Sequence, residues 1–163
     1  MDSFDLYPFL EWIHIVNAAV LFGAGIGSAF HMWQTHKTGN VEAIAVAARN
    51  TVRLDHLITM PAAVIQPVTG VLMIVFVGFP WDMPWLIVSY VLYLMVGLFW
   101  LPVLISQKKA MILAQQAVRD KKPLPPEYNV RMNTWFRFGG PLVLSLFIIF
   151  FLMVHKPDFW LYW

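Results

Sequence analysis

The sequence predicts an all-α protein built as a four-helix bundle in a membrane, and its composition is the first reason. Of its 163 residues, 60% are hydrophobic and only 12% are charged. An average soluble domain is about 45–50% apolar and about 25% charged, and a chain of this size buries only about two-thirds of the surface that its unfolded form exposes. The excess apolar surface must face lipid. This excludes an ordinary soluble enzyme, a disordered segment and a nucleic-acid-binding domain.

The second reason is that four apolar windows are long enough to cross a bilayer. A hydrocarbon core about 30 Å thick needs about 20 mostly apolar residues per helix. The first window is too long for a cleavable signal peptide, and acidic residues precede it where a signal needs positive charge. We therefore expect one transmembrane domain over residues 1–163. Its spans are predicted at about residues 8–33, 54–77, 85–106 and 138–155.

The third reason is the placement of basic residues, which also predicts the orientation. Lysine and arginine are enriched in cytoplasmic loops of membrane proteins. Ten of the eleven lie in the connection between the first and second spans or in that between the third and fourth. We therefore expect both termini outside, an N-out/C-out topology, and both long loops in the cytoplasm. The basic excess then reports topology and does not indicate nucleic acid as a partner.

The connections themselves carry structural signals. An alanine-rich stretch in the first loop favours a helix that leads into the second span, and QKKAMILAQQAVRDKK has the spacing of a helix that prolongs the third. The prolines of KPLPPEY then end that helix. The short turn GFPWDMP predicts that the second and third spans are antiparallel neighbours.

Polar residues on the first span mark a face that points into the protein. Glu11, His14 and Asn17 recur at i, i+3 and i+6, and Gly25 and Ser28 continue the same sector. Ionisable groups inside a membrane are costly, so each is a functional hypothesis by default. We expect His14 to be a functional residue, with Glu11 and Asn17 orienting its imidazole.

Two features of the spans have more than one interpretation. Gly23 and Gly27 form a GxxxG pattern, which is typical of close helix packing but also leaves room for a flat ligand such as a porphyrin. Pro61 and Pro67 interrupt the second span. They indicate either a kinked packing helix or a pocket at the kink.

Histidines near the span ends predict a haem site. Two neutral imidazoles on facing helices are a common way for a bundle to hold haem b. His31 ends the first span and His56 opens the second on the same side of the membrane, so they can be neighbours. Together with the deeper His14 they are the candidate cofactor ligands. His14 and His56 are the expected metal ligands. The alternative for each is a hydrogen-bonding residue at the membrane interface. The absence of cysteine excludes disulfides, iron–sulfur ligation and covalent haem attachment.

Short motifs in all four spans add a family resemblance. They are WIHIVNAAVLFGAG, DHLITMPAAVIQPVTGVLM, NTWFRFGGPLVL and VHKPDF. With them the chain resembles small bacterial integral-membrane proteins known only as a domain of unknown function, distantly similar to HemJ-type protoporphyrinogen oxidases and CopD-like membrane domains. The resemblance implies a multi-pass protein of the bacterial plasma (inner) membrane that binds haem b and uses His14 and Lys156. Trp100 stands where HemJ carries a third-helix histidine, so a second ligand would come from His31, His56 or His155.

Three functions remain open from the sequence. The leading hypothesis is a haem-b-binding membrane protein with a redox or electron-transfer role, for which oxidation of a quinol or porphyrinogen is a candidate reaction. The second is a cofactor-free accessory subunit of a larger membrane complex, and the third a small-molecule or metal transporter akin to the CopD domains. The bilayer is the expected environment in each case, with assembly into a homo- or hetero-oligomer.

Overall fold

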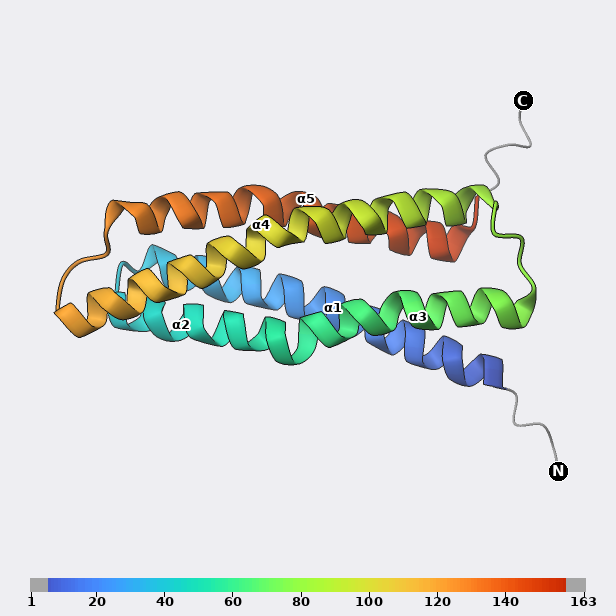
Figure 1. The fold of residues 1–163 in the computed structure, drawn as a ribbon, viewed down its shortest axis with the longest axis horizontal. Helices are drawn as coiled ribbons and strands as arrows, with labels where there is room; N and C mark the ends of the chain where they lie inside the picture. The colour runs from blue at the N-terminus through green and yellow to red at the C-terminus, as the bar shows by residue number, and fades with distance from the viewer. Residues whose placement is uncertain (1–5, 158–163) are drawn as a thin grey trace.

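The computed structural model describes residues 6–157, and over that range the chain is entirely helical apart from short connections (Figure 1). Four helical stretches are long and apolar enough to cross a membrane. The all-α four-helix prediction is therefore confirmed, while residues 1–5 and 158–163 of the predicted domain lie outside the described range. The elements are α1 (Leu6–Lys37), α2 (Val41–Leu54), the π-helical η1 (Asp55–Thr59), α3 (Met60–Val77), α4 (Pro84–Asp120) and α5 (Pro126–His155).

The helices extend further than the apolar windows do. The second spanning stretch is a continuous helix from α2 through η1 to α3, and α4 runs on past residue 106 to Asp120. At 1.5 Å per residue, the 37 residues of α4 measure about 55 Å, far more than the roughly 30 Å of a hydrocarbon core. The predicted helical extensions of both connections are confirmed. The proline-rich break is confirmed too, since α4 ends there with Lys121 at a positive φ of 53°.

The bundle has two different ends. We call the end with the α1–α2 and α4–α5 connections the loop end; it lies at the left of Figure 1. The opposite end, with the α3–α4 turn and the first and last described residues, is the terminal end. The basic residues of both connections lie toward the loop end.

The loop end has the densest packing. There α2 buries Ile44 and a row of small residues, and α4 contributes Ala110 and Ala114, both almost fully buried. Alanines allow the two helix backbones to approach closely. Tyr128 and Met132 of α5 complete this cluster. The loop end is thus held together like the core of a small soluble bundle.

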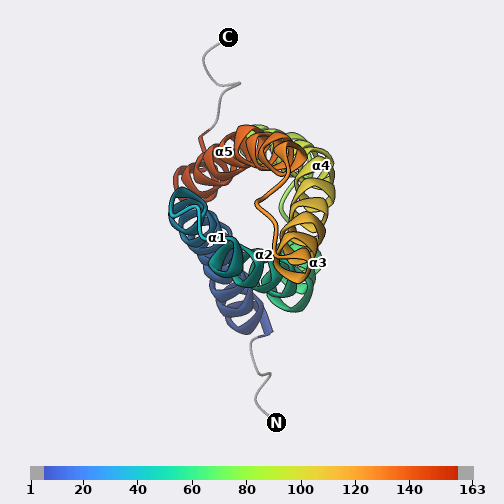
Figure 2. The ribbon, with the colours of Figure 1, turned by 90° about the vertical axis from the view of Figure 1, so that its left-hand side faces the viewer.

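The membrane part of the bundle is more open. Viewed end on in Figure 2, α1, α2 and α3 lie on one side of the bundle and α4 and α5 on the other. Within residues 6–157, no Cα atom of α3 lies within 8 Å of a Cα atom of α4. The second and third spans are antiparallel neighbours, as predicted, because α2 packs against α4, whereas α3 and α4 lack close backbone contact over the described residues. Side chains link them instead, including Ile74 with Trp85 near the terminal end.

A proline in α3 shapes one of these links. Pro67 lacks an N–H group, so it cannot donate a helical hydrogen bond to the carbonyl of Ala63. The Tyr93 hydroxyl of α4 donates to that carbonyl at 2.6 Å. A hydrogen bond from the facing helix thereby satisfies a carbonyl that α3 itself leaves without a partner.

Candidate functional site

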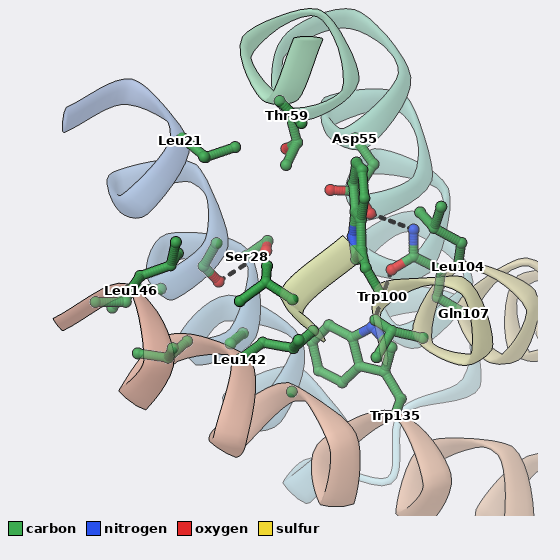
Figure 3. A pocket seen from close by; sticks show the side chains of 18 of the residues that line it. Leu21, Ser28, Asp55, Thr59, Trp100, Leu104, Gln107, Trp135, Leu142 and Leu146 are labelled. Carbon is green, nitrogen blue, oxygen red and sulfur yellow. Dashed lines mark hydrogen bonds between the residues drawn. The ribbon is translucent and has the colours of Figure 1, made fainter. Parts of the chain in front are cut away.

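A large cavity occupies the centre of the bundle. It measures about 1030 Å³, is partly open, and is lined by residues of α1, η1, α3, α4 and α5 (Figure 3). Its walls are almost entirely apolar or aromatic. The exceptions are a few polar side chains, namely Ser28, Asp55, Thr59, Tyr93 and Gln107.

Glycines create much of this space. Gly25 of α1, Gly97 of α4, and Gly139 and Gly140 of α5 all line the cavity. A Cβ atom added at any of them would meet no atom within 4 Å. Longer side chains at these positions would project into the cavity, so the walls are kept open from three helices.

The GxxxG pair on α1 behaves differently. Cβ atoms at Gly23 and Gly27 would also meet nothing within 4 Å, yet neither residue lines the cavity. The prediction that Gly23 and Gly27 pack closely against another helix is therefore wrong for contacts within the chain. The neighbouring expectation is confirmed, because Gly25 and Ser28 do face the interior.

One end of the cavity carries a buried polar relay. Gln107 of α4 donates through Nε2 to Oδ2 of Asp55, and its Oε1 accepts a hydrogen bond from Trp135 Nε1 at 2.9 Å. All three side chains are buried. The second carboxyl oxygen of Asp55 points away from Gln107 toward the cavity (Figure 3). The relay therefore fixes the carboxyl group from behind and leaves one face toward the open space.

The local backbone explains where Asp55 lies. It opens the π-helical segment η1, in which its carbonyl accepts from Met60 N–H, five residues on. Pro61 follows directly and cannot donate to the preceding turn. Such π-helical turns recur at functional sites. Thr59, in the same segment, is 7% exposed, and its hydroxyl lies near the Asp55 carboxyl without reaching hydrogen-bond geometry.

A second polar cluster joins α1 to α3. His14 Nδ1 lies 2.8 Å from Thr69 Oγ1, and His14 Nε2 lies 2.9 Å from Gln66 Nε2. Because an amide nitrogen only donates, Nε2 must be the acceptor and Nδ1 the protonated nitrogen. Asn17 Nδ2 donates to Gln66 Oε1 at 2.6 Å and to Ala62 O at 2.8 Å. Asn17 thus orients His14 through Gln66 rather than by direct contact.

Close packing also fixes the imidazole. A Cβ atom at Gly70 would lie 3.3 Å from His14 Cε1, so the ring occupies the space that this glycine leaves. The ring does not line the cavity. The cluster therefore works as a clasp between two helices, beside the cavity and not inside it.

The other predicted site residues lie elsewhere. Glu11 is exposed and takes no part in the hydrogen bonds of His14. His31 and His56 are both exposed, and His56 Nδ1 donates to Val52 O at 2.8 Å. Lys156 caps α5 at a positive φ of 45°, with its Nζ 5.5 Å from the centroid of the Phe79 ring. The structure therefore does not gather these residues around His14.

Haem b has no prepared site among these side chains. No histidine lines the cavity, and both ring nitrogens of His14 already have hydrogen-bond partners. Over residues 6–157 there is also no group of three or more His, Cys, Asp or Glu residues arranged to hold a metal ion. Neither the cavity nor His14 therefore offers a haem ligand, and haem b stays a prediction from the sequence.

The Asp55 relay was not singled out from the sequence. An acid at the start of an apolar span and a glutamine at the end of another were visible there. Nothing in the spacing, however, shows that two residues 52 positions apart share a hydrogen bond. A signal was available in Asp55 itself, because an acid beside an apolar span is rare unless it has a role.

Fold and site together define the class: a polytopic α-helical integral membrane protein with a glycine-walled internal cavity. Residues 8–157 match the family described as "Predicted integral membrane protein (DUF2269)", and the chain belongs to that family. The expected membership of a domain of unknown function is thereby confirmed. No curated protein and no solved structure matches the chain. The likeness to HemJ and CopD proteins is not shown and stays a resemblance.

Proposed function

We propose that this protein binds a lipid-soluble small molecule in its central cavity. The observation that carries the proposal is the cavity itself, at about 1030 Å³. Pockets for small molecules measure about 300–1,000 Å³ and are mostly apolar with a few placed polar groups. This cavity has that character, with the Asp55 relay supplying the polar groups.

The separation of α3 and α4 supports a route from the bilayer. Their backbones stay more than 8 Å apart within the described chain. Tyr93 bridges the two helices by its hydrogen bond to Ala63. A molecule dissolved in lipid would enter between these helices, and displacement of one tyrosine side chain would widen its path.

A comparison of two double variants tests cavity binding. Gly97→Leu with Gly139→Leu fills the cavity from two walls, whereas Gly23→Leu with Gly27→Leu adds the same atoms outside it. Each protein is purified gently, and its bound small molecules are extracted and identified by mass spectrometry. We expect wild type and the outer variant to carry a molecule that the filled variant lacks. Equal amounts of the bound molecule in both folded variants would refute the proposal.

We further propose an N-out/C-out orientation in a bacterial inner membrane, supported by the basic loop end. The chain has no cysteine, so single cysteines can be introduced without a background. Gly39→Cys probes the α1–α2 connection and Asp82→Cys the α3–α4 turn. A membrane-impermeant maleimide added to intact cells should label only Asp82→Cys. Labelling of only Gly39→Cys would reverse the orientation.

A haem-b redox role is the second candidate, and one observation favours it. The hydrogen bond from His56 Nδ1 to Val52 fixes the tautomer and leaves Nε2 of this exposed imidazole free to ligate. Haem b held there would need its second ligand from another subunit, in line with the expected homo- or hetero-oligomer. Bound haem supplies one-electron chemistry, as oxidation of a quinol or porphyrinogen requires.

A reduced-minus-oxidised visible spectrum with a pyridine haemochrome count tests that candidate. A b-type signal that disappears in His56→Ala but persists in His36→Ala would support it. Protein purified gently from its own membrane without a Soret band would eliminate it. Stable co-purification with defined membrane proteins, again without visible absorbance, would favour the accessory-subunit alternative.

A further inference from the structure

We infer that the cavity selects a lipid-soluble organic cation, with Asp55 as its counter-charge; this inference rests on the proposed function. Asp55 is the only Asp, Glu, Lys, Arg or His among the residues that line the cavity. It is 6% exposed. The ligand class would be a protonated or quaternary nitrogen, or a comparable cation, carried on a bulky apolar body.

Asp55 forms no ion pair in the described part of the chain, although the exposed His56 next to it acts on its charge. The ion pair found there joins Arg131 and Glu127, on the surface. Lys37 lies 3.4 Å over the ring of Trp33 and not against the carboxyl group. A buried carboxylate without a counter-charge is costly, and the neutral amide of Gln107 provides only a hydrogen bond. A bound cation would supply the missing charge.

The aromatic walls have the chemistry to hold such a body. Trp100, Trp135, Phe136, Phe30 and Tyr93 all line the cavity. Indole, phenyl and phenol rings attract cations through their π faces, and the attraction grows when water is excluded. A carboxylate together with aromatic walls therefore favours a hydrophobic cation on two independent grounds.

Other ligand charges fit less well. No lysine, arginine or histidine lines the cavity, so an anion would meet Asp55 without any compensating positive charge. A neutral lipid would fill the apolar walls but leave the carboxylate unpaired. Thr59, buried beside Asp55 with an unpartnered hydroxyl, can accept or donate one further hydrogen bond. The observed set of groups is thus complementary to a cation.

Two ions of matched shape and opposite charge test the inference on the full chain in lipid nanodiscs. The probes are tetraphenylphosphonium and tetraphenylborate, with binding followed by calorimetry and tryptophan fluorescence. We expect saturable binding of one tetraphenylphosphonium per chain and no saturable binding of tetraphenylborate. Equal affinities for the two ions in wild type would overturn the inference without any mutation.

Variants then locate the charge. Asp55→Asn keeps an oxygen that accepts from Gln107 while removing the charge, and should weaken tetraphenylphosphonium binding about tenfold or more. Glu127→Gln removes a surface charge and should leave binding unchanged. Unaltered affinity in folded Asp55→Asn would also overturn the inference.

The cavity-filled double variant separates this inference from the proposed function. In one outcome, both ions bind the wild-type protein equally and neither binds the variant filled at Gly97 and Gly139. The cavity is then a binding site without charge selectivity. Only the cation inference then fails. If filling changes the binding of neither ion, the proposed function fails as well.

Discussion

Replacing Gln107 by leucine is the sharpest perturbation of the buried relay. The substitution keeps a side chain of similar size but removes both hydrogen bonds, leaving the Asp55 carboxyl and the Trp135 indole N–H without partners. Each buried group left unpaired costs about 1–3 kcal/mol, so the two together set an upper range of about 2–6 kcal/mol. Hydrogen bonds between membrane helices average only about 0.6 kcal/mol, which sets a lower bound of about 1 kcal/mol for two.

We expect the loss to lie between these limits, at about 2–4 kcal/mol, because one of the stranded groups is ionisable and costs more than a neutral one. The assay is reversible unfolding in mixed micelles by titration with a denaturing detergent, followed by circular dichroism. Gln34→Leu is the matched control, since Gln34 is an exposed glutamine on α1, and should change stability by less than about 0.5 kcal/mol.

A double variant shows whether the stranded carboxyl causes the loss. Adding Asp55→Leu to Gln107→Leu removes that group, so the double variant should recover part of the lost stability. The reasoning is refuted if Gln107→Leu proves as stable as Gln34→Leu. It is also refuted if adding Asp55→Leu lowers stability further by the full amount expected of an independent site.

Three further predictions concern the contacts between helices, all measured as unfolding free energy in the same micelles. His14→Ala breaks both hydrogen bonds of the α1–α3 clasp and should cost about 1–3 kcal/mol; an unchanged midpoint would contradict the clasp. Tyr93→Phe leaves the Ala63 carbonyl without its donor and should cost about 1 kcal/mol, with faster backbone hydrogen exchange in α3 as a second readout. Gly27→Ala should stabilise α1 by up to about 1 kcal/mol through helix propensity. Gly70→Ala should gain less stability, because its Cβ atom would lie 3.3 Å from the His14 imidazole. Equal gains in the two variants would show that the His14 ring moves aside without cost.

The structure divides the molecule into a tightly packed part and an open part. At the loop end, alanines of α2 and α4 bring the backbones together around Tyr128. In the membrane part, glycines on three helices face a cavity and do not face one another. Small residues thus serve opposite purposes in the two parts. In this arrangement the loop end holds the bundle together while the membrane part keeps an open cavity.

The His14 cluster shows how far sequence reasoning reached toward the site. Helical spacing placed His14 and Asn17 on one inward face, and the structure has both in one cluster. Spacing could not reveal that Gln66 lies between them, since that contact joins residues about fifty positions apart on another helix. The same periodicity placed Glu11 on this face, but the helix end is exposed there, so the face stops being interior before it reaches Glu11.

The sequence by itself determined the membrane environment, the four spans, the helical extensions and the asymmetric charge of the two ends. These follow from local composition and periodicity, because the cost of exposing backbone and charge to lipid acts on each segment independently. Only the tertiary structure decided that α3 and α4 stand apart, that Gly23 and Gly27 make no contact within the chain, and that Asp55 meets Gln107 and Trp135 beside a cavity. Helices in lipid associate through packing and a few hydrogen bonds, not through a hydrophobic drive. Their partners are therefore chosen by the shapes of whole faces, which no single segment of the sequence contains.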